Sequence, residues 1–483
     1  MALASPAQGA GKHPAKRATD HNMGERQHSP PAHRDRIDIK PSRLELGGKV
    51  VVPTTTYNGQ FPGPLLRLDQ GVPVTIDIEN STGAPEQLHW HGQFISPLID
   101  GAAEEGTPFI PANGRRKIVL TPQPSGLRYY HSHVVAGSDL SRGLYSGQAG
   151  VVYISPKRDE GAYDREVFLT LKEFGPYLSH DEMGSSFLYP ANGARDLYLM
   201  DQEAVRAATK LGRRSGYEIA YRFHTINGKM LGYGAPIRVA RGDRILLHVV
   251  NASATEIRSL ALPGHTFRVL ALDGNRVPRP GEVPVVWLGP GERISATVDM
   301  NRPGVWVLGD VDDHARALGM GVVVEYSGAA GRPQWRRQIR SRWDYRAFAK
   351  SEAKAREPDE TIVLTIATRY SAQDGFNVFT INNEPFSMRT MRPKYNLRFG
   401  RRYRLRLRNA TDDVHPIHLH RHSFELTSVA GKPTSGLIKD VIMIDAFQEM
   451  TIDFTADELG LSLFHCHMQH HMDFGFMALF DCQ

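Results

Sequence analysis

The residues with the clearest capacity for chemistry lie near the C-terminal end, in the run His465-Cys466-His467 with His471 four residues further on. Alternate side chains of an extended strand point to opposite faces, so His465 and His467 share one face while Cys466 points to the other. One strand can therefore hold ligands for two metal sites. A thiolate with imidazoles selects copper or zinc, and two histidines with one cysteine are typical of an electron-transfer copper site. The alternative is a buried cysteine between structural histidines.

Other histidine clusters in the chain argue against that alternative. Eight histidines form four His-X-His pairs: His89 and His91, His131 and His133, His418 and His420, His465 and His467. Within a strand the two residues of a pair are roughly 6.6 Å apart at their Cα atoms, so neighbouring rings can serve different metals. A single pair would be weak evidence, because zinc sites also use it. Four pairs are what a three-copper cluster at a domain interface would require.

His415 provides a ligand for the other face. It lies three residues before His418, which is an odd step, so on an extended strand it faces away from His418 and His420 and in the direction of Cys466. The expected blue copper site is His415, Cys466 and His471, with the cluster on the opposite side. The backbone of Cys466, flanked by His465 and His467, would connect the two sites covalently.

A repeat orders the chain. Residues 71–80, 242–251 and 400–409 each begin with Gly, alternate in polarity like a strand and end in a turn-forming Asn. Histidines occur nine and eleven residues after Asn80 and Asn409, whereas Leu260 and Leu262 occupy these positions after Asn251. Histidines also occur five and seven residues after Gly126 and after Gly460, but not at the same distances after Gly304. The outer units therefore carry the ligands and the middle unit does not.

Length and composition favour several β domains. A chain of 483 residues with 45 Gly, 31 Pro and short alternating apolar runs favours β-sandwiches or barrels. The expected divisions are a disordered tail at 1–37, domains at 38–158 and 159–330, a basic linker at 331–357 and a third domain at 358–483. Residues 201–211 and part of the linker have helical composition.

The net charge of +6 does not indicate a nucleic-acid partner. The linker holds nine Lys and Arg against three Asp and Glu, which equals the imbalance of the whole chain, so it is expected to be a solvated connector. Cys466 and Cys482 are the only cysteines and define no disulfide framework. No apolar run is long enough for a membrane span, and the tail lacks the apolar core of a signal peptide.

These motifs resemble the multicopper oxidases, specifically the three-domain laccase-like enzymes. The resemblance rests on His89-Trp-His-Gly92, His131-Ser-His133, His415-Pro-Ile-His-Leu-His420 and His465-Cys-His-Met-Gln-His-His471, with Tyr57–Pro64 ahead of the first. It implies an all-β chain of three consecutive cupredoxin-like Greek-key domains. It also implies four copper ions: one type 1, one type 2 and two type 3.

The same resemblance assigns the ligands. His415, Cys466 and His471 match the type 1 site, and His89 and His418 match type 2. One type 3 copper matches His91, His131 and His467, and the other matches His133, His420 and His465. Phe476 occupies the axial position of type 1, where many bacterial members have Met. A noncoordinating axial residue should raise the reduction potential, unless Met477 swings in as a ligand.

Carboxylates are expected nearby. Asp100 matches the family's acidic residue that delivers protons to reduced oxygen, although it could be a turn residue before Gly101. The position after His471, often Glu in bacterial relatives, is Met472, and Asp473 is a candidate substitute. Asp440 could accept the free ring N–H of His415, or could be an ordinary turn acid.

The expected function is oxidation of phenolic or related aromatic donors by single electrons at type 1 copper, with dioxygen reduced to water at the trinuclear cluster. Metal-ion oxidation, of cuprous or manganous ions, is the alternative within the enzyme class, and a copper-binding cupredoxin protein without turnover is the alternative outside it. The expected partners are a small reducing substrate and dioxygen, without nucleic acid, for a monomer. The resemblance implies a periplasmic or secreted location.

Overall fold

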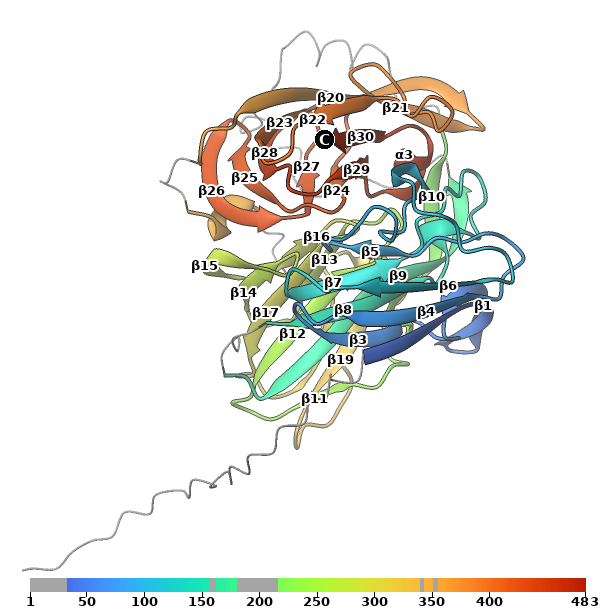
Figure 1. Ribbon diagram of the computed structural model, residues 1–483. Helices are drawn as coiled ribbons and strands as arrows, with labels where there is room; N and C mark the ends of the chain where they lie inside the picture. Colours follow the sequence, from blue (N-terminus) through green and yellow to red (C-terminus); the bar gives the residue numbers. More distant parts are fainter. Residues whose placement is uncertain (1–32, 157–161, 180–215, 339–342, 351–354) are drawn as a thin grey trace, which may run out of the picture.

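The computed structural model describes residues 33–156, 162–179, 216–338, 343–350 and 355–483. Its architecture is all-β, with three consecutive cupredoxin-like domains built from six sheets (Figure 1). Among the described residues, no helix combines the length and the apolar character that crossing a membrane would require.

The first domain pairs two four-stranded sheets. Its elements are β1 (His33–Gly47), β2 (Val50–Tyr57), β3 (Gly63–Asp69), β4 (Val74–Asn80), β5 (His89–His91), η1 (Ala103–Glu105), β6 (Arg115–Leu120), β7 (Gly126–His131), η2 (Gly143–Tyr145) and β8 (Ala149–Ser155). The strand orders are β2-β1-β4-β6 and β3-β8-β7-β5. Alternate residues of β4, including Ile76 and Ile78, are buried in the core between them.

The second domain has a six-stranded and a five-stranded sheet. Its elements are β9 (Arg165–Ser179), β10 (Glu218–Ile226), β11 (Ile237–Val239), β12 (Arg244–Asn251), β13 (Arg258–Ala261), β14 (Phe267–Leu272), β15 (Asn275–Val283), β16 (Val286–Leu288), β17 (Arg293–Asp299), β18 (Val305–Asp310), α2 (Asp313–Ala317) and β19 (Gly321–Tyr326). The orders are β10-β9-β12-β17-β14-β15 and β11-β19-β18-β13-β16.

The third domain repeats this plan. Its elements are η5 (Tyr345–Phe348), β20 (Glu360–Gln373), β21 (Phe376–Ile381), β22 (Lys394–Leu397), β23 (Arg402–Asn409), β24 (His415–Leu419), β25 (Phe424–Val429), β26 (Lys432–Lys439), β27 (Val441–Ile444), β28 (Glu449–Thr455), β29 (Gly460–Cys466), α3 (Gln469–Asp473) and β30 (Met477–Cys482). The orders are β21-β20-β23-β28-β25-β26 and β22-β30-β29-β24-β27.

The Asn that closes each repeated strand has the same role in all three domains. Asn80, Asn251 and Asn409 are buried, and each donates its side-chain N–H groups to a carbonyl four or five residues later and to another 30 to 37 residues later. These bonds fix the loop that leaves the strand. In the outer domains that loop leads to a histidine pair.

Two expectations from the sequence are wrong in detail. Strand β1 starts at His33, inside the predicted tail, because Arg34 and Arg36 pair with Asp77 and Glu79 of the parallel strand β4. The rest of the predicted tail, residues 1–32, lies outside the described residues.

The predicted solvated linker is also partly buried. Trp343, Tyr345 and Phe348 are at most 5% exposed, because this segment packs its aromatic rings into the shared core of the second and third domains. The Tyr345 hydroxyl donates to Glu292 at 2.7 Å and accepts from the backbone N–H of Met443 at 3.1 Å. The predicted helical stretch 201–211 lies outside the described residues.

Candidate metal centres

Strands β24 and β29 are antiparallel neighbours and present the first group of ligand candidates. Their pairing sets Ile417 opposite Cys466, and the short helix α3 returns His471 to the same side. The sulfur of Cys466 is 3.4 Å from Nδ1 of His471 and 3.7 Å from Nδ1 of His415, and the two Nδ1 atoms are 3.1 Å apart. The three residues predicted for the blue site are therefore brought together, and all are buried.

A chain of hydrogen bonds orients His415. The Thr411 hydroxyl donates to Oδ1 of Asn409 at 2.8 Å and lies 2.7 Å from Nε2 of His415. Because the Thr411 hydroxyl has a single proton and donates it to Asn409, it accepts the Nε2–H of His415. This tautomer leaves Nδ1 of His415 without a proton and directed at the sulfur. Burial raises the pKa of the Cys466 thiol well above its usual value, so a bound metal ion would have to replace its proton.

Phe476, the predicted axial residue, packs against this group. Its ring centroid is 5.1 Å from that of His415, and it is completely buried in the same cluster as Cys466. Met477 starts β30 opposite His465 and packs with Leu463 in a different cluster. Of the two residues 476 and 477, the one that packs against the group is therefore the noncoordinating Phe476.

The eight paired histidines converge between the first and third domains. Three sets have ligand atoms within 4.8 Å of one another: His91, His131 and His467; His133, His420 and His465; His89, His91 and His418. Every one of the eight is buried, at 3% exposed or less. The first two sets match the predicted type 3 groups, and the third contains both predicted type 2 residues.

Hydrogen bonds fix several of these rings at one nitrogen, while the other nitrogen faces a neighbouring histidine or has no partner. Backbone carbonyls accept from Nδ1 of His131, His418 and His465 at 2.7 to 2.9 Å. The second ring nitrogens of His89 and His418, and both of His133, are buried without a partner in the structure. Buried donors and acceptors are normally satisfied. Several unsatisfied imidazole nitrogens in one cavity fit a metal cluster, and the donor set is one that suits copper or zinc.

Asp100 holds two of the rings. Its carboxylate accepts from Nδ1 of His420 at 2.9 Å and lies 3.0 Å from Nδ1 of His89. Burial alone would raise the pKa of Asp100, but the attraction of His89 and the bond from His420 outweigh it, and the pKa lies well below its usual value. Asp100 is therefore an anion in the cavity wall and no mere turn residue.

The prediction that Asp440 accepts the free ring N–H of His415 is wrong, because its carboxylate contacts His91 instead. Strand β27 pairs His418 with Val441 and His415 with Ile444, so Asp440 lies at the far end of the pairing from His415. Its carboxylate Oδ1 is 3.2 Å from Nε2 of His91. The same carboxylate also binds two buried arginines, Arg128 of the first domain and Arg293 of the second.

Two buried carboxylates near the cavity were missed from the sequence. Glu104 and Glu105 form η1 just after Asp100, and burial raises the pKa of both. Oε1 of Glu105 is 3.4 Å from Nδ1 of His420 and accepts from the Leu463 backbone N–H at 2.6 Å. Their sequence, Ala-Ala-Glu-Glu-Gly, is that of a solvated turn and gives no sign of burial.

Met472 and Asp473 follow the blue-site histidine. Met472 is buried among apolar side chains. Asp473 accepts from the backbone N–H groups of Ala136 and Gly137 and from the Gln469 amide, and burial raises its pKa to about 7. Its role as a substitute for the missing Glu stays a prediction.

The other histidines have ordinary structural partners. His422 bonds to the His420 carbonyl, His470 lies 3.3 Å from Glu218, and His248 and His265 each contact two partners. His180 is outside the described residues. Discounting these histidines as ligands agrees with the geometry, since none joins a metal-compatible group within the described ranges.

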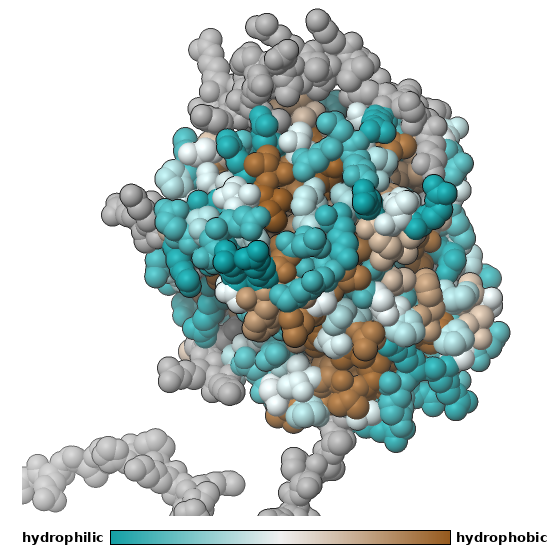
Figure 2. Space-filling model, turned by 45° about the horizontal axis from the view of Figure 1, so that its top comes forward, coloured by the Kyte–Doolittle hydropathy of each residue, from teal (hydrophilic) through white to brown (hydrophobic). Residues whose placement is uncertain are grey.

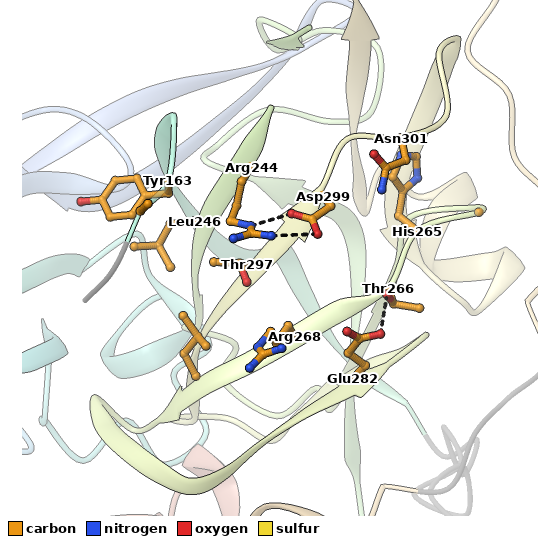
Figure 3. Close-up of a pocket in the computed structure, with 13 residues that line it drawn as sticks. Tyr163, Arg244, Leu246, His265, Thr266, Arg268, Glu282, Thr297, Asp299 and Asn301 are labelled. Carbon is orange, nitrogen blue, oxygen red and sulfur yellow. Dashed lines mark hydrogen bonds and ion pairs between the residues drawn. The ribbon is translucent and has the colours of Figure 1, made fainter. Parts of the chain in front are cut away.

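A hollow of about 540 Å³ lies on the second domain, and none of the candidate metal ligands lines it (Figure 3). Arg244 is paired with Asp299 and Thr266 bonds to Glu282 across it, so its polar groups largely satisfy one another. On the face shown in Figure 2, hydrophilic residues surround smaller hydrophobic groups. The buried histidine cavity, by contrast, contains several ring nitrogens without a hydrogen-bond partner.

Comparison with known proteins agrees with this architecture. Family models described as multicopper oxidase match residues 38–159, 193–320 and 355–483. The chain belongs to the multicopper oxidases, which are copper-dependent oxidoreductases that use oxygen.

Individual relatives match over most of their length. The multicopper oxidase MmcO of Mycobacterium tuberculosis is 28% identical, covering 92% of this chain and 85% of the relative. The crystal structure of a multicopper oxidase from Pseudomonas thermotolerans is 24% identical with a TM-score of 0.69, covering 94% of this chain and all of that one. A laccase from Botrytis aclada is 18% identical with a TM-score of 0.73, covering 93% and 88%.

Proposed function

We propose that this protein is a laccase-like oxidase that takes single electrons from phenolic or related aromatic donors and reduces dioxygen to water. His415, Cys466 and His471 would hold a type 1 copper. His89 and His418 would hold type 2 copper, and the groups of His91, His131 and His467 and of His133, His420 and His465 the two type 3 ions. When bound, copper supplies the one-electron redox chemistry and the site at which dioxygen is reduced.

The observation that carries this proposal is the position of Cys466 between two cluster ligands. Its neighbours His465 and His467 belong to the two opposite three-histidine groups, while its own sulfur faces His415 and His471. The Cys466 carbonyl also accepts from Nδ1 of His465 at 2.8 Å. A short covalent and hydrogen-bonded path thus joins the electron-entry group to the cluster.

The surroundings of the Cys466 group support a high reduction potential. The centroid of the Phe379 ring lies 4.0 Å from that of the His471 ring, and Phe476 packs against His415. These buried aromatic rings exclude water, and Phe476 offers no atom that donates to copper. A high potential would allow electrons to be taken from phenolic donors.

Asp100 would serve the oxygen-reducing side. Its carboxylate holds the Nδ1–H groups of His420 and His89 and can pass a proton through its oxygen atoms into the cavity. All eleven ligands come from one chain, which supports a monomer. The resemblance to exported enzymes supports a periplasmic or secreted location.

The test is oxygen consumption by copper-loaded protein with a phenolic donor. We expect consumption by the unaltered chain and its loss in Cys466→Ser, because serine provides no thiolate to link the sites. Arg258→Lys is the folding control, since Arg258 is buried in the second domain and pairs with Glu173 away from the cluster. Undiminished consumption in Cys466→Ser would contradict the proposal, and faster turnover of cuprous or manganous ions than of phenols would replace the donor class by metal ions.

A further inference from the structure

The second domain supplies no histidine to the cavity, but it reaches the cavity with another segment. Asn251 closes the repeated strand there and holds residues 288–292: its amide donates to the Leu288 carbonyl at 2.8 Å, and its backbone bonds to Gly291 and Glu292 at 2.9 and 3.0 Å. This segment leads directly into Arg293, the first residue of β17. The Asn that fixes a histidine loop in the outer domains therefore fixes Gly291 and Arg293 in the middle domain.

Arg293 controls the surroundings of His91. It binds both oxygens of Asp440, with Nη1 to Oδ1 at 2.5 Å and Nη2 to Oδ2 at 2.6 Å. Oδ1 of Asp440 is in turn 3.2 Å from Nε2 of His91. All three side chains are completely buried, so no water competes for these bonds. The planar arginine fork fixes the plane of the carboxylate, and the carboxylate fixes which nitrogen of His91 faces the cavity.

The same arginine lies beside the partner of His467. Its guanidinium carbon is 5.9 Å from the centre of the Tyr129 ring, and the Tyr129 hydroxyl is 2.8 Å from Nε2 of His467. Gly291 contacts the His467 ring directly, since a Cβ built there would be 2.8 Å from Cδ2 and 3.0 Å from Nε2. Gly291 also has a φ of +85°, which favours glycine.

We propose that Arg293 is a positioning residue through which the histidine-free middle domain orients His91 and His467, and so fixes one of the two three-histidine groups. Through Asp440 it sets His91, and through Tyr129, together with the close approach of Gly291, it sets His467. With its Nε2 held by Asp440, His91 presents Nδ1 to Nε2 of His131 of the same group at 3.4 Å. This inference rests on the proposed function, because it assumes that the group binds copper.

The test is Arg293→Lys in the full chain, which keeps the charge and removes the fork. Copper per chain, competition for copper with a chelator and the electron-spin spectrum are compared with those of Arg258→Lys, a matched change of a buried arginine in the same domain. We expect about 10- to 100-fold weaker retention of copper by the cluster in Arg293→Lys, as is typical when a hydrogen-bond partner of a ligand is lost. The blue absorption of the Cys466 site should persist in both variants.

Equal copper retention and equal spectra in Arg293→Lys and Arg258→Lys would overturn the inference. If Arg293→Lys does not accumulate as folded protein, Gly291→Ala decides, because its methyl group would press on the His467 ring: weaker cluster copper with an intact blue band supports the inference, and unaltered copper refutes it. The unaltered chain separates this result from failure of the proposed function. If that chain retains only the copper at Cys466, the proposed function itself fails.

Discussion

The group of His91, His131 and His467 and the group of His133, His420 and His465 share one cavity, but paired arginines and carboxylates lie behind the first and carboxylates behind the second. Behind the first lies a buried network in which arginines of the first two domains meet the carboxylate of Asp440. Behind the second lie three carboxylates of the first domain: Asp100, Glu104 and Glu105. Their nearest polar partners are the histidines themselves, and the positive charge of Arg421 also acts on Glu105.

This difference separates two tasks of the protein. The arginine side joins all three domains through fully paired charges, so it orients ligands and stabilises the domain arrangement. On the acidic side, Glu104 and Glu105 each have a buried carboxylate oxygen without a hydrogen-bond partner, and burial raises the pKa of both, so this side retains the capacity to hold protons. We infer that substitutions on the arginine side cost stability first, and those on the acidic side cost pH-dependent function first.

The largest expected effect is that of Asp440→Ala. It leaves Arg293 and Arg128 buried without their shared carboxylate, and breaking a buried ion pair in this way costs about 3–5 kcal/mol. The measurement is denaturant unfolding of the copper-free protein, with Asp440→Asn as a comparison that keeps the shape and one acceptor oxygen but removes the charge. A cost below about 1 kcal/mol would show that the network does not stabilise the domain junction.

Asp100→Asn should affect metal more than folding. The amide can no longer accept from two rings as an anion, so copper retention by the cluster should fall by about 10- to 100-fold. Chelator competition measures this, with the Cys466 blue band as the internal reference. Loss of the blue band together with the cluster copper would point to general unfolding and contradict a local role.

The acidic side should give the copper-free protein a distinct pH response. The pKa of Glu104 is raised by burial, so its contribution to stability is fully present below the pKa of the unfolded chain and is lost as pH rises through the folded pKa. Glu104→Gln removes this loss. Unfolding free energies at pH 5 and pH 8 should therefore differ less in the variant than in the unaltered protein, and an identical difference would exclude a titrating Glu104.

The smallest effect on the cluster is expected from Phe476→Met. A thioether beside His415 and Cys466 can donate to copper, which should lower the potential of the blue site and leave cluster copper unchanged. Redox titration of the blue band tests this. An unchanged potential would mean that the residue at 476 does not face the metal.

Strand periodicity predicted much of the site from the sequence. The odd and even steps among His415, His418, Cys466 and His467 assign ligands to two faces, and β24 and β29 are regular enough to follow that rule. The partner of Asp440 was missed because it depends on the register of β27, which no local pattern encodes. Arg293 was missed for a related reason, because it meets the cavity only through contacts with the other two domains, and Glu104 was missed because its short turn gives no sign of burial.

Prediction of the fold from the sequence also failed where residues meet between domains. Alternating polarity and the repeated Gly-to-Asn strands predicted three β domains, while the burial of Trp343 and Tyr345 depends on a core shared by two domains. The count of charged residues over 331–357 reflects the arginines and lysines of this segment and does not predict the burial of its aromatic rings.

The central claim is that eleven residues form two metal centres back to back, joined through Cys466. Metal analysis of copper-loaded protein, with the electron-spin spectrum of the same sample, tests it most directly. The account predicts four copper ions per chain, three of which remain in Cys466→Ser as the blue signal disappears. About one copper per chain in the unaltered protein, or loss of all copper in the variant, would contradict it.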